Sequence, residues 1–414
     1  MTPGFFYLIS AQFVSSLADN ALLLVGIALV TEQGQAAWWI PALKALVMLS
    51  FVVLAPWVGV WSDRWPKRHV MMSANALKAL ACVGLMFQWH PFVSFALIGF
   101  GASLYSPAKY GLITELEPPE RLVKANGWVE VSTVGAAVLG VALGGWLIST
   151  PVRSISWIAS PESLGMTATA LLPAFLLLLC SYALAALLNF KIPLSTVMYL
   201  PLHGARYQPL RRFAKANQTL WRDEAGQLSL SVTTLFWGVG ATLQLLLLAW
   251  GQQHLNLSLG QAAYLQAGAA IGVVAGAYCA GRYLRLQQAH TVLWVGVLMG
   301  CLIPCLIFVT SLTVAVLLAL VVGFMSGFFL VPMNALLQHR GCQLLRSGES
   351  IAVQNFNENS CVLSMMILYG LLLSVQFPIN VILAILGVTV ALVMLRIIAR
   401  YRRSQKENYQ ELIT

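Results

Sequence analysis

Long runs of apolar residues follow one another along the whole chain, each about 20 residues or more in length. A helix that crosses a bilayer needs about 20 apolar residues, whereas a strand of a transmembrane barrel needs only about 10 residues of alternating polarity. The continuous runs therefore predict membrane-spanning helices. Only 9% of the residues are charged, far below the roughly 25% of a soluble domain. Twelve spans are predicted, at residues 5–31, 38–61, 69–89, 91–113, 123–149, 166–190, 227–250, 260–283, 289–309, 312–336, 349–374 and 379–399.

The distribution of lysine and arginine predicts the orientation of these spans. With both termini in the cytoplasm, twenty of the 24 basic residues lie on the cytoplasmic side, three lie within helices, and Arg153 alone lies outside. Cytoplasmic loops of membrane proteins carry such an excess. The net charge of +10 is therefore a signal of orientation in the bilayer, and we expect no nucleic-acid partner.

The longest cytoplasmic connection, residues 191–226, divides the chain into two parts of similar length. Each part carries a proline near the end of its fourth span, followed by an amide and a glutamate four residues apart in its fifth span. These residues are Pro107, Asn126 and Glu130 in the first part, and Pro332, Gln354 and Glu358 in the second. We predict an all-α polytopic protein of two six-helix bundles with pseudo-two-fold symmetry, residues 1–190 and 227–414, joined by a linker.

Signatures of enzymes and of metal sites are missing from the sequence. No HExxH, GxSxG or P-loop pattern occurs, and no histidine is followed five positions later by an acidic residue. The seven cysteines form no paired CxxC motifs, and six of them fall in apolar segments, where cysteine packs as a small hydrophobic residue. We expect no enzyme, no disulfide, no metal and no cofactor. The first apolar run is too long for a signal peptide and is kept as a helix.

The connection after the second span, Gly59 to Arg68, resembles the GxxxDRxGrk signature of the major facilitator superfamily, with Pro66 in place of the second glycine. A glycine permits close packing of helices, and an aspartate can bind a helix N-terminus or an arginine. The resemblance implies a conformational latch formed by Gly59, Asp63, Arg64, Lys67 and Arg68. The alternative is a basic turn that only sets the topology. The corresponding segment of the second half, 276–285, keeps Gly281 and Arg282 but has no acidic residue.

Charged residues inside the predicted helices are concentrated in the first half. Such residues are costly in a bilayer and usually face a cavity or an ionic partner. Asp19 shares one helical face with three other polar residues, which favours a cavity, and the alternative is a purely structural pair. Lys78 is either a binding residue or one half of a buried ion pair, and Lys109 and Glu130 either bind substrate or bridge each other. Lys44, near an outer end, can reach the membrane surface.

The eleventh span opens with a polar block, Gln354 to Asn359, that contains one apolar residue in six. These side chains are expected to line water, a substrate or another helix. In the tenth span, Asn334 and Gln338 lie one turn apart and could face the block. Glu358 is the charge that lies well inside a helix of the second half.

Several stretches resemble bacterial lysophospholipid transporters, a family within the superfamily. They are residues 11–23, 105–111, 124–130, 235–238, 331–338 and 352–359. The resemblance covers about residues 10–395. It departs at Gln244, where the family has an arginine, and at His339, where it has a glutamate.

The resemblance implies a monomeric flippase in the bacterial inner membrane. It would move lysophosphatidylethanolamine and lysophosphatidylglycerol from the outer to the inner leaflet. The acyltransferase–acyl carrier protein synthetase Aas would then re-acylate them. The candidate substrate-binding residues are Asp19, Asn20, Lys78, Lys109, Asn126, Glu130, Asn334, Gln338, Gln354, Asn355 and Glu358.

The uneven charge suggests how such a substrate would be held. The charged first half would bind the head group and the nearly neutral second half would shelter the tail, with substrate entering sideways from the bilayer. Three rivals stay open. They are an ion-coupled exporter of drugs or other small amphiphiles, a membrane-embedded lipid enzyme, and a non-transporting scaffold for Aas.

Overall fold

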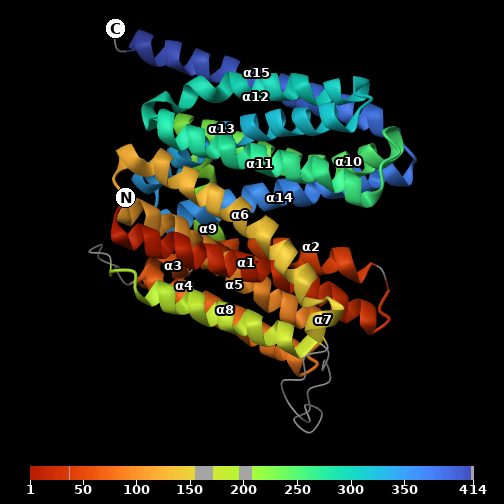
Figure 1. The fold of residues 1–414 in the computed structure, drawn as a ribbon. Coiled ribbons are helices and arrows are strands. Elements are labelled where there is room, and N and C mark those ends of the chain that lie inside the picture. Colours follow the sequence, from red (N-terminus) through yellow and green to blue (C-terminus); the bar gives the residue numbers. More distant parts are fainter. Residues whose placement is uncertain (37, 154–170, 195–207, 412–414) are drawn as a thin grey trace. The chain divides into compact units, whose positions relative to one another are not determined.

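The computed structural model describes residues 1–36, 38–153, 171–194 and 208–411, and every regular element in these ranges is a helix (Figure 1). The elements are α1 Pro3–Glu32, α2 Trp39–Val53, α3 Ala55–Arg64, α4 Lys67–Met86, α5 Pro91–Leu116, η1 Pro119–Arg121, α6 Leu122–Leu147, α7 Thr150–Arg153, α8 Leu172–Phe190, α9 Pro209–Arg222, α10 Glu224–His254, α11 Leu259–Tyr283, η4 Leu286–Val292, α12 Leu293–Leu302, η5 Ile303–Phe308, α13 Leu312–Leu344, α14 Ser347–Ser374 and α15 Ile379–Glu411.

The described helices confirm the all-helical membrane fold. Eleven of them are long and apolar enough to cross a bilayer, and the number is twelve when the bent pair α2–α3 is counted as one span. The first residues of the predicted span 166–190 lie outside the described ranges, and α8 represents the rest of it.

The second predicted span, 38–61, is broken rather than straight. Its two parts, α2 and α3, meet at an angle of 65°. Pro56 lies in the first turn of α3, where proline is tolerated because its missing N–H would have no helical partner there. In a continuous helix the same proline would remove a hydrogen bond and clash with the preceding turn, so the helix restarts instead.

The predicted linker contains a helix that the sequence alone did not indicate. This helix, α9, is strongly amphipathic, with Ala216 and Leu220 buried and Arg211, Lys215 and Arg222 on its more exposed side. Its polar face is basic, in agreement with the predicted cytoplasmic location of the linker.

The chain packs into two compact units. Unit 1 contains residues Met1–Glu117, Ser132–Ala214 and Leu345–Phe356, and unit 2 contains Pro118–Val131, Lys215–Leu344 and Asn357–Thr414. The first turns of α6 therefore pack in unit 2, and the first turns of α14 pack in unit 1. The predicted bundle boundaries stay a prediction, because three helices, α6, α9 and α14, pass from one unit to the other.

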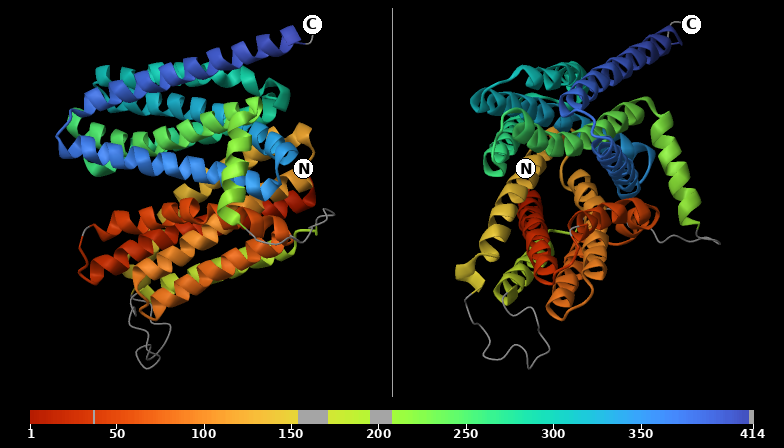
Figure 2. Two further views of the ribbon diagram at one scale, coloured as in Figure 1. Left: turned by 180° about the vertical axis from the view of Figure 1, so that it is seen from behind. Right: turned by 90° about the vertical axis from the view of Figure 1, so that its right-hand side faces the viewer.

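Each unit has its own apolar core. In unit 1, α1, α4, α5 and α8 bury side chains that include Leu22, Cys82, Phe95 and Phe175. In unit 2, α10, α12, α13 and α15 bury side chains that include Trp250, Phe329, Leu383 and Met394. Figure 2 shows α12 and α15 running beside each other in unit 2.

Glycines bring α11 and α13 into direct backbone contact in unit 2. A Cβ atom on Gly272 or Gly276 would overlap the backbone of α13, and a Cβ atom on Gly323 or Gly327 would overlap the backbone of α11. Lipid tails are as apolar as leucine, so helices in a membrane associate through close packing of this kind rather than through the hydrophobic effect.

Candidate functional site

A buried polar cluster in unit 1 joins α1 to α4 and α8. The Nζ atom of Lys78 donates to Asp19 Oδ2 at 2.6 Å and to Ser15 Oγ at 3.1 Å. The hydroxyl of Tyr182 donates to Asp19 Oδ1 at 2.9 Å, and Ser15 Oγ donates to Asn75 Oδ1 at 2.7 Å. The ion-pair alternative for Lys78 is therefore the geometry observed, with Asp19 as its partner.

The two charges of this cluster differ in their access to solvent. The side chain of Lys78 is 2% exposed, while that of Asp19 is 26% exposed. The Lys78 ammonium also lies 5.1 Å from the ring centre of Tyr105 and 6.0 Å from that of Tyr182, within range of cation–π attraction. Lys78 is thus held by its surroundings and balances the charge of Asp19, whereas Asp19 keeps one side open.

The other polar residues on this face of α1 contact neighbouring helices or their own backbone. Gln12 Nε2 donates to Thr133 Oγ1 at 2.9 Å, which links α1 to α6 within unit 1. Asn20 Nδ2 donates to the carbonyl of Ser16 at 2.8 Å, one turn back in the same helix.

Two of the amides predicted to bind substrate form a pair in unit 2. Asn126 Nδ2 donates to Gln338 Oε1 at 2.9 Å, and Gln338 Nε2 donates to Asn126 Oδ1 at 2.8 Å. Both side chains are buried, so the pair joins the start of α6 to α13. In unit 1, Asn355 Nδ2 donates to Ser106 Oγ at 2.9 Å, which joins the start of α14 to α5. The polar block of the eleventh span thus contacts another helix, one of the three predicted alternatives.

The remaining candidates lie in the helices that the sequence assigned to them. Lys109, in α5, is half-buried, with its Nζ atom 4.2 Å from the ring centre of Tyr110. Four are buried, at 5–7% exposure: Glu130, Asn334, Gln354 and Glu358.

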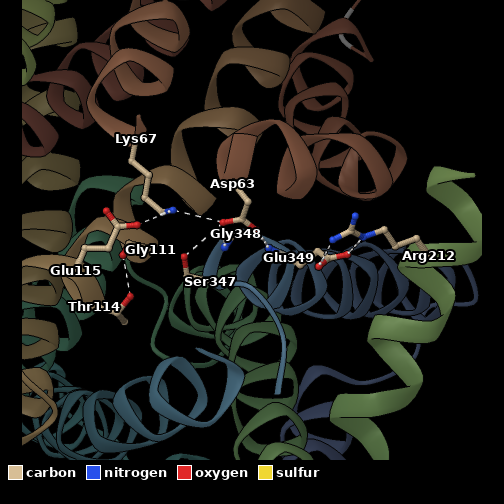
Figure 3. A network of polar contacts seen from close by, with 9 residues as sticks. All are labelled: Asp63, Lys67, Gly111, Thr114, Glu115, Arg212, Ser347, Gly348 and Glu349. Atoms are coloured by element: carbon tan, nitrogen blue, oxygen red, sulfur yellow. Dashed lines mark hydrogen bonds and ion pairs between the residues drawn. The ribbon is translucent and has the colours of Figure 1, made fainter. Parts of the chain in front are cut away.

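The predicted latch residue Asp63 caps the N-terminus of α14 (Figure 3). Its Oδ1 accepts the backbone N–H of Gly348 at 2.8 Å, and its Oδ2 accepts that of Glu349 at 3.0 Å. Ser347 Oγ lies 3.5 Å from Asp63 Oδ1. The first N–H groups of a helix have no partner within the helix, and the positive end of the helix dipole attracts a carboxylate. Asp63 supplies both the acceptor and the charge.

Lys67 lies one turn after Asp63 and connects two carboxylates. Its Nζ atom is 3.4 Å from Asp63 Oδ1 and 2.8 Å from Glu115 Oε1 in α5 (Figure 3). The side chains of Lys67, Asp63 and Glu115 are 2%, 6% and 7% exposed. A buried ion that loses its partner is strongly destabilising, so the three residues depend on one another.

The other basic residues of the motif have different surroundings. Arg68 donates from Nη1 to the carbonyl of Ile192 at 3.0 Å, and its guanidinium lies 5.5 Å from the ring centre of Phe190. It therefore binds the C-terminal end of α8, where a cation is favoured by the helix dipole. Arg64 is exposed.

Gly59 brings α3 and α14 close together. A Cβ atom at this position would lie 2.9 Å from the Cβ atom of Ala352 and 2.9 Å from the carbonyl oxygen of Gly348. The linker helix α9 adds a further contact, since Arg212 forms a two-point ion pair with Glu349, one bond of which is 2.8 Å long (Figure 3).

Unit 2 has a corresponding contact between α6 and α11. A Cβ atom on Gly127 would lie 2.8 Å from the carbonyl oxygen of Ala277 and 3.2 Å from the Cα atom of Gly281. Gly281 belongs to the segment 276–285 that corresponds to the latch motif. Glycine packing is thus present in both contacts, while the acidic residue of the motif is present in one.

A family model described as Major Facilitator Superfamily matches residues 8–357. The chain belongs to the major facilitator superfamily. It is 38% identical, over 378 residues, to the lysophospholipid transporter LplT of Cronobacter sakazakii (strain ATCC BAA-894), covering 91% of this chain and 90% of that relative. It is 37% identical, over 373 residues, to LplT of Yersinia pestis (strain Pestoides F), covering 89% and 86%.

Solved structures agree with this major facilitator fold. A bacterial homologue of the iron transporter ferroportin in its outward-facing state matches with a TM-score of 0.72 at 18% identity, over 97% of this chain and 100% of that one. The transporter FucP in an outward conformation matches with a TM-score of 0.72 at 14% identity, over 97% and 99%. The protein is a multi-pass membrane transporter, which confirms the prediction that it is not an enzyme.

Several residues that contact the candidate sites of this major facilitator protein were not predicted from the sequence. Asn75 lies three residues before Lys78 on one helical face, and that spacing was a readable signal. Tyr105 and Tyr182 gave no such signal, because a tyrosine in an apolar helix is also a common core residue. Glu115 and Arg212 could not be predicted either, because their partners, Lys67 and Glu349, lie in helices distant in sequence.

Proposed function

We propose that the protein is a lysophospholipid flippase of the bacterial inner membrane. It would move lysophosphatidylethanolamine and lysophosphatidylglycerol from the outer to the inner leaflet, where Aas re-acylates them. The observation that carries this proposal is the similarity to lysophospholipid transporters over nine-tenths of the chain. The polar cluster of unit 1 supplies chemistry that suits the head group of such a lipid.

Asp19 is the residue of that cluster that we assign to the head group. Its carboxylate keeps an exposed side while Lys78 and Tyr182 hold its two oxygens. An ethanolamine ammonium would add a third hydrogen bond together with the attraction of opposite charges, and a glycerol hydroxyl would add a third hydrogen bond without a second charge. Lys78 is too deeply buried to reach a phosphate without moving, so we assign it to positioning and charge balance.

Lys109 is the better candidate for the phosphate. It is half-buried, and a lysine ammonium binds phosphate as a point charge. The less charged second half of the chain would shelter the acyl tail. The contacts of Asp63 with α14 would act as the latch, because they join helices of both halves of the sequence and must open when the halves rock.

The proposal can be tested by uptake of labelled lysophosphatidylethanolamine into spheroplasts that lack their own flippase but contain the acyltransferase. We expect conversion to the diacyl lipid to depend on this protein and to fall about tenfold in Asp19→Asn, the factor that corresponds to about 1.4 kcal/mol. Glu120→Gln, which neutralises an exposed carboxylate in η1, should keep the wild-type rate. Proton-dependent drug efflux without lipid conversion would support the small-amphiphile exporter instead.

A further inference from the structure

An open groove of about 440 Å³ lies between α12 and α15 in unit 2. Five of its lining residues come from one face of α15, at the spacing of successive helical turns, and the sixth is the second residue of α12. The lining residues are Trp294, Leu395, Ile398, Ala399, Arg402 and Arg403.

The groove combines two guanidinium groups with an aromatic ring. The Arg402 guanidinium lies 5.6 Å from the ring centre of Trp294, and Arg402 and Arg403 are both exposed. Within the part of the chain that the structure describes, no acidic residue lines the groove. Glu224, the first residue of α10, accepts a hydrogen bond of 2.9 Å from Gln405 and is not among the residues that line the groove. Two positive charges therefore face a lining that is otherwise apolar.

The groove lies at the end of a membrane span. The candidate span of α15 runs from Ile379 to Gln405, so Arg402 and Arg403 belong to its last turn, and Leu395 and Ile398 lie one to two turns deeper. The distribution of lysine and arginine predicts that this end is cytoplasmic. Tryptophan is enriched at the same level, where lipid head groups meet the hydrocarbon.

We propose that this groove binds an anionic diacyl phospholipid, with its phosphodiester between Arg402 and Arg403. An acyl chain would run along Leu395 and Ile398. The planar guanidinium donates two parallel hydrogen bonds to phosphate oxygens, which suits arginine better than lysine for this role. A zwitterionic lipid binds less well, because its ammonium is repelled by the two guanidinium groups. The site is built from unit 2 alone and does not depend on the transported substrate.

The test uses the purified full-length protein in uncharged detergent, titrated with phosphatidylglycerol while bound lipid is counted by native mass spectrometry. We expect phosphatidylglycerol to bind more tightly than phosphatidylethanolamine. We expect Arg402→Gln to weaken binding about fivefold, the effect of one basic residue near an anionic surface, and Arg402→Lys to weaken it less. The double variant with Arg403→Gln should bind about twentyfold more weakly. Arg403→Gln alone provides the same comparison if Arg402→Gln fails to fold.

Arg400→Gln is the matched control, because it removes the same charge from the same helix but lies off the groove. It should leave phosphatidylglycerol binding unchanged. An equal loss in Arg400→Gln would overturn the proposal in favour of diffuse attraction by a basic helix. Equal binding of phosphatidylethanolamine would also overturn it, and so would competition by inorganic phosphate at the same concentration, which would identify a site for free anions.

Discussion

The α3–α14 contact of unit 1 and the α6–α11 contact of unit 2 are built on the same glycine packing but differ in charge. In each, a glycine lies so close to the neighbouring helix that an added Cβ atom would come within 3 Å of its backbone, at Gly59 and at Gly127. The unit 1 contact adds a buried carboxylate on a helix N-terminus and an ion pair beside it. The unit 2 contact is accompanied instead by the neutral pair Asn126–Gln338.

The comparison of the two contacts separates two contributions to helix contact, close packing and the pairing of charges. Close packing depends on shape and is lost over a fraction of an ångström. The charged contribution requires that Asp63, Lys67 and Glu115 remain paired whenever they are buried. We therefore expect unit 1 to be sensitive to changes of charge and both contacts to be sensitive to added volume.

The largest expected effect follows removal of the lysine that connects the two carboxylates. Lys67→Met leaves Asp63 and Glu115 buried without their shared cation, at a cost of roughly 3–5 kcal/mol. We expect a clear fall in the thermal unfolding midpoint of the purified protein, measured by intrinsic tryptophan fluorescence. Lys67→Met combined with Glu115→Gln should recover part of the loss. Arg64→Met, at an exposed position of the same motif, is the control, and an equal fall there would refute the pairing.

Added volume should affect both contacts alike. Gly59→Ala and Gly127→Ala each place a Cβ atom within 3 Å of a neighbouring helix, which costs about 1–3 kcal/mol where helices cannot shift. We expect lipid conversion in spheroplasts to fall about tenfold in both variants. Gly145→Ala, where a Cβ atom meets nothing within 4 Å, should have no effect. A fall in lipid conversion in only one of these two variants would contradict the view that both contacts depend on the same glycine packing.

The neutral amide pair should contribute less to the stability of the fold than the ionic network of unit 1, and its contribution should not depend on salt concentration. A double-mutant cycle with Asn126→Ala and Gln338→Ala should give a coupling free energy of about 1 kcal/mol in thermal unfolding. Because neither side chain is charged, this value should be the same at low and high potassium chloride concentration. A coupling free energy that disappears at high salt concentration would show that the Asn126–Gln338 contact depends on charge, which would contradict this account.

The smallest effect concerns an ion pair of unit 2 at the end of the linker. Asp223 caps α10 and forms a two-point pair with Arg340 in α13. Burial alone would raise the pKa of Asp223, but the bonds from Arg340 and Gly226 lower it below its ordinary value of 3.8. Its stabilising contribution is therefore present at neutral pH and is lost as the pH falls below about 3.8.

We thus expect Asp223→Asn to lower the unfolding midpoint slightly at pH 7, by the equivalent of less than about 1 kcal/mol, because Arg340 is 39% exposed. The difference from wild type should shrink as the pH falls through this range. A difference that grows on acidification would contradict the sign of the pKa change.

The spans were predictable because their signals are local, and the motif at Gly59 to Arg68 could be recognised for the same reason, while its role as a latch stays a prediction. A run of apolar residues or a motif of ten residues lies within one segment of sequence. The bend of 65° between α2 and α3 was not predicted. The sequence predicted one span over residues 38–61, because the run of apolar residues continues across the bend.

The pairings were not predictable, because one sequence does not say which helix faces which. Asp19 and Lys78 are 59 positions apart, and Asn126 and Gln338 are 212 apart. The spacing along each helix placed these residues on polar faces, but their partners come from the packing. The same holds for Glu349, which meets Asp63 through its backbone and Arg212 through its side chain.

The most direct test of lipid transport through the unit 1 cluster uses the purified protein alone in vesicles. Fluorescent lysophosphatidylethanolamine is placed in the outer leaflet, and the fraction protected from a membrane-impermeant quencher is followed over time. We predict rapid protection with the wild-type protein, and slow protection with Asp19→Asn inserted at the same density. Protection at the protein-free rate in wild-type vesicles, or at the wild-type rate in Asp19→Asn vesicles, would contradict the proposal.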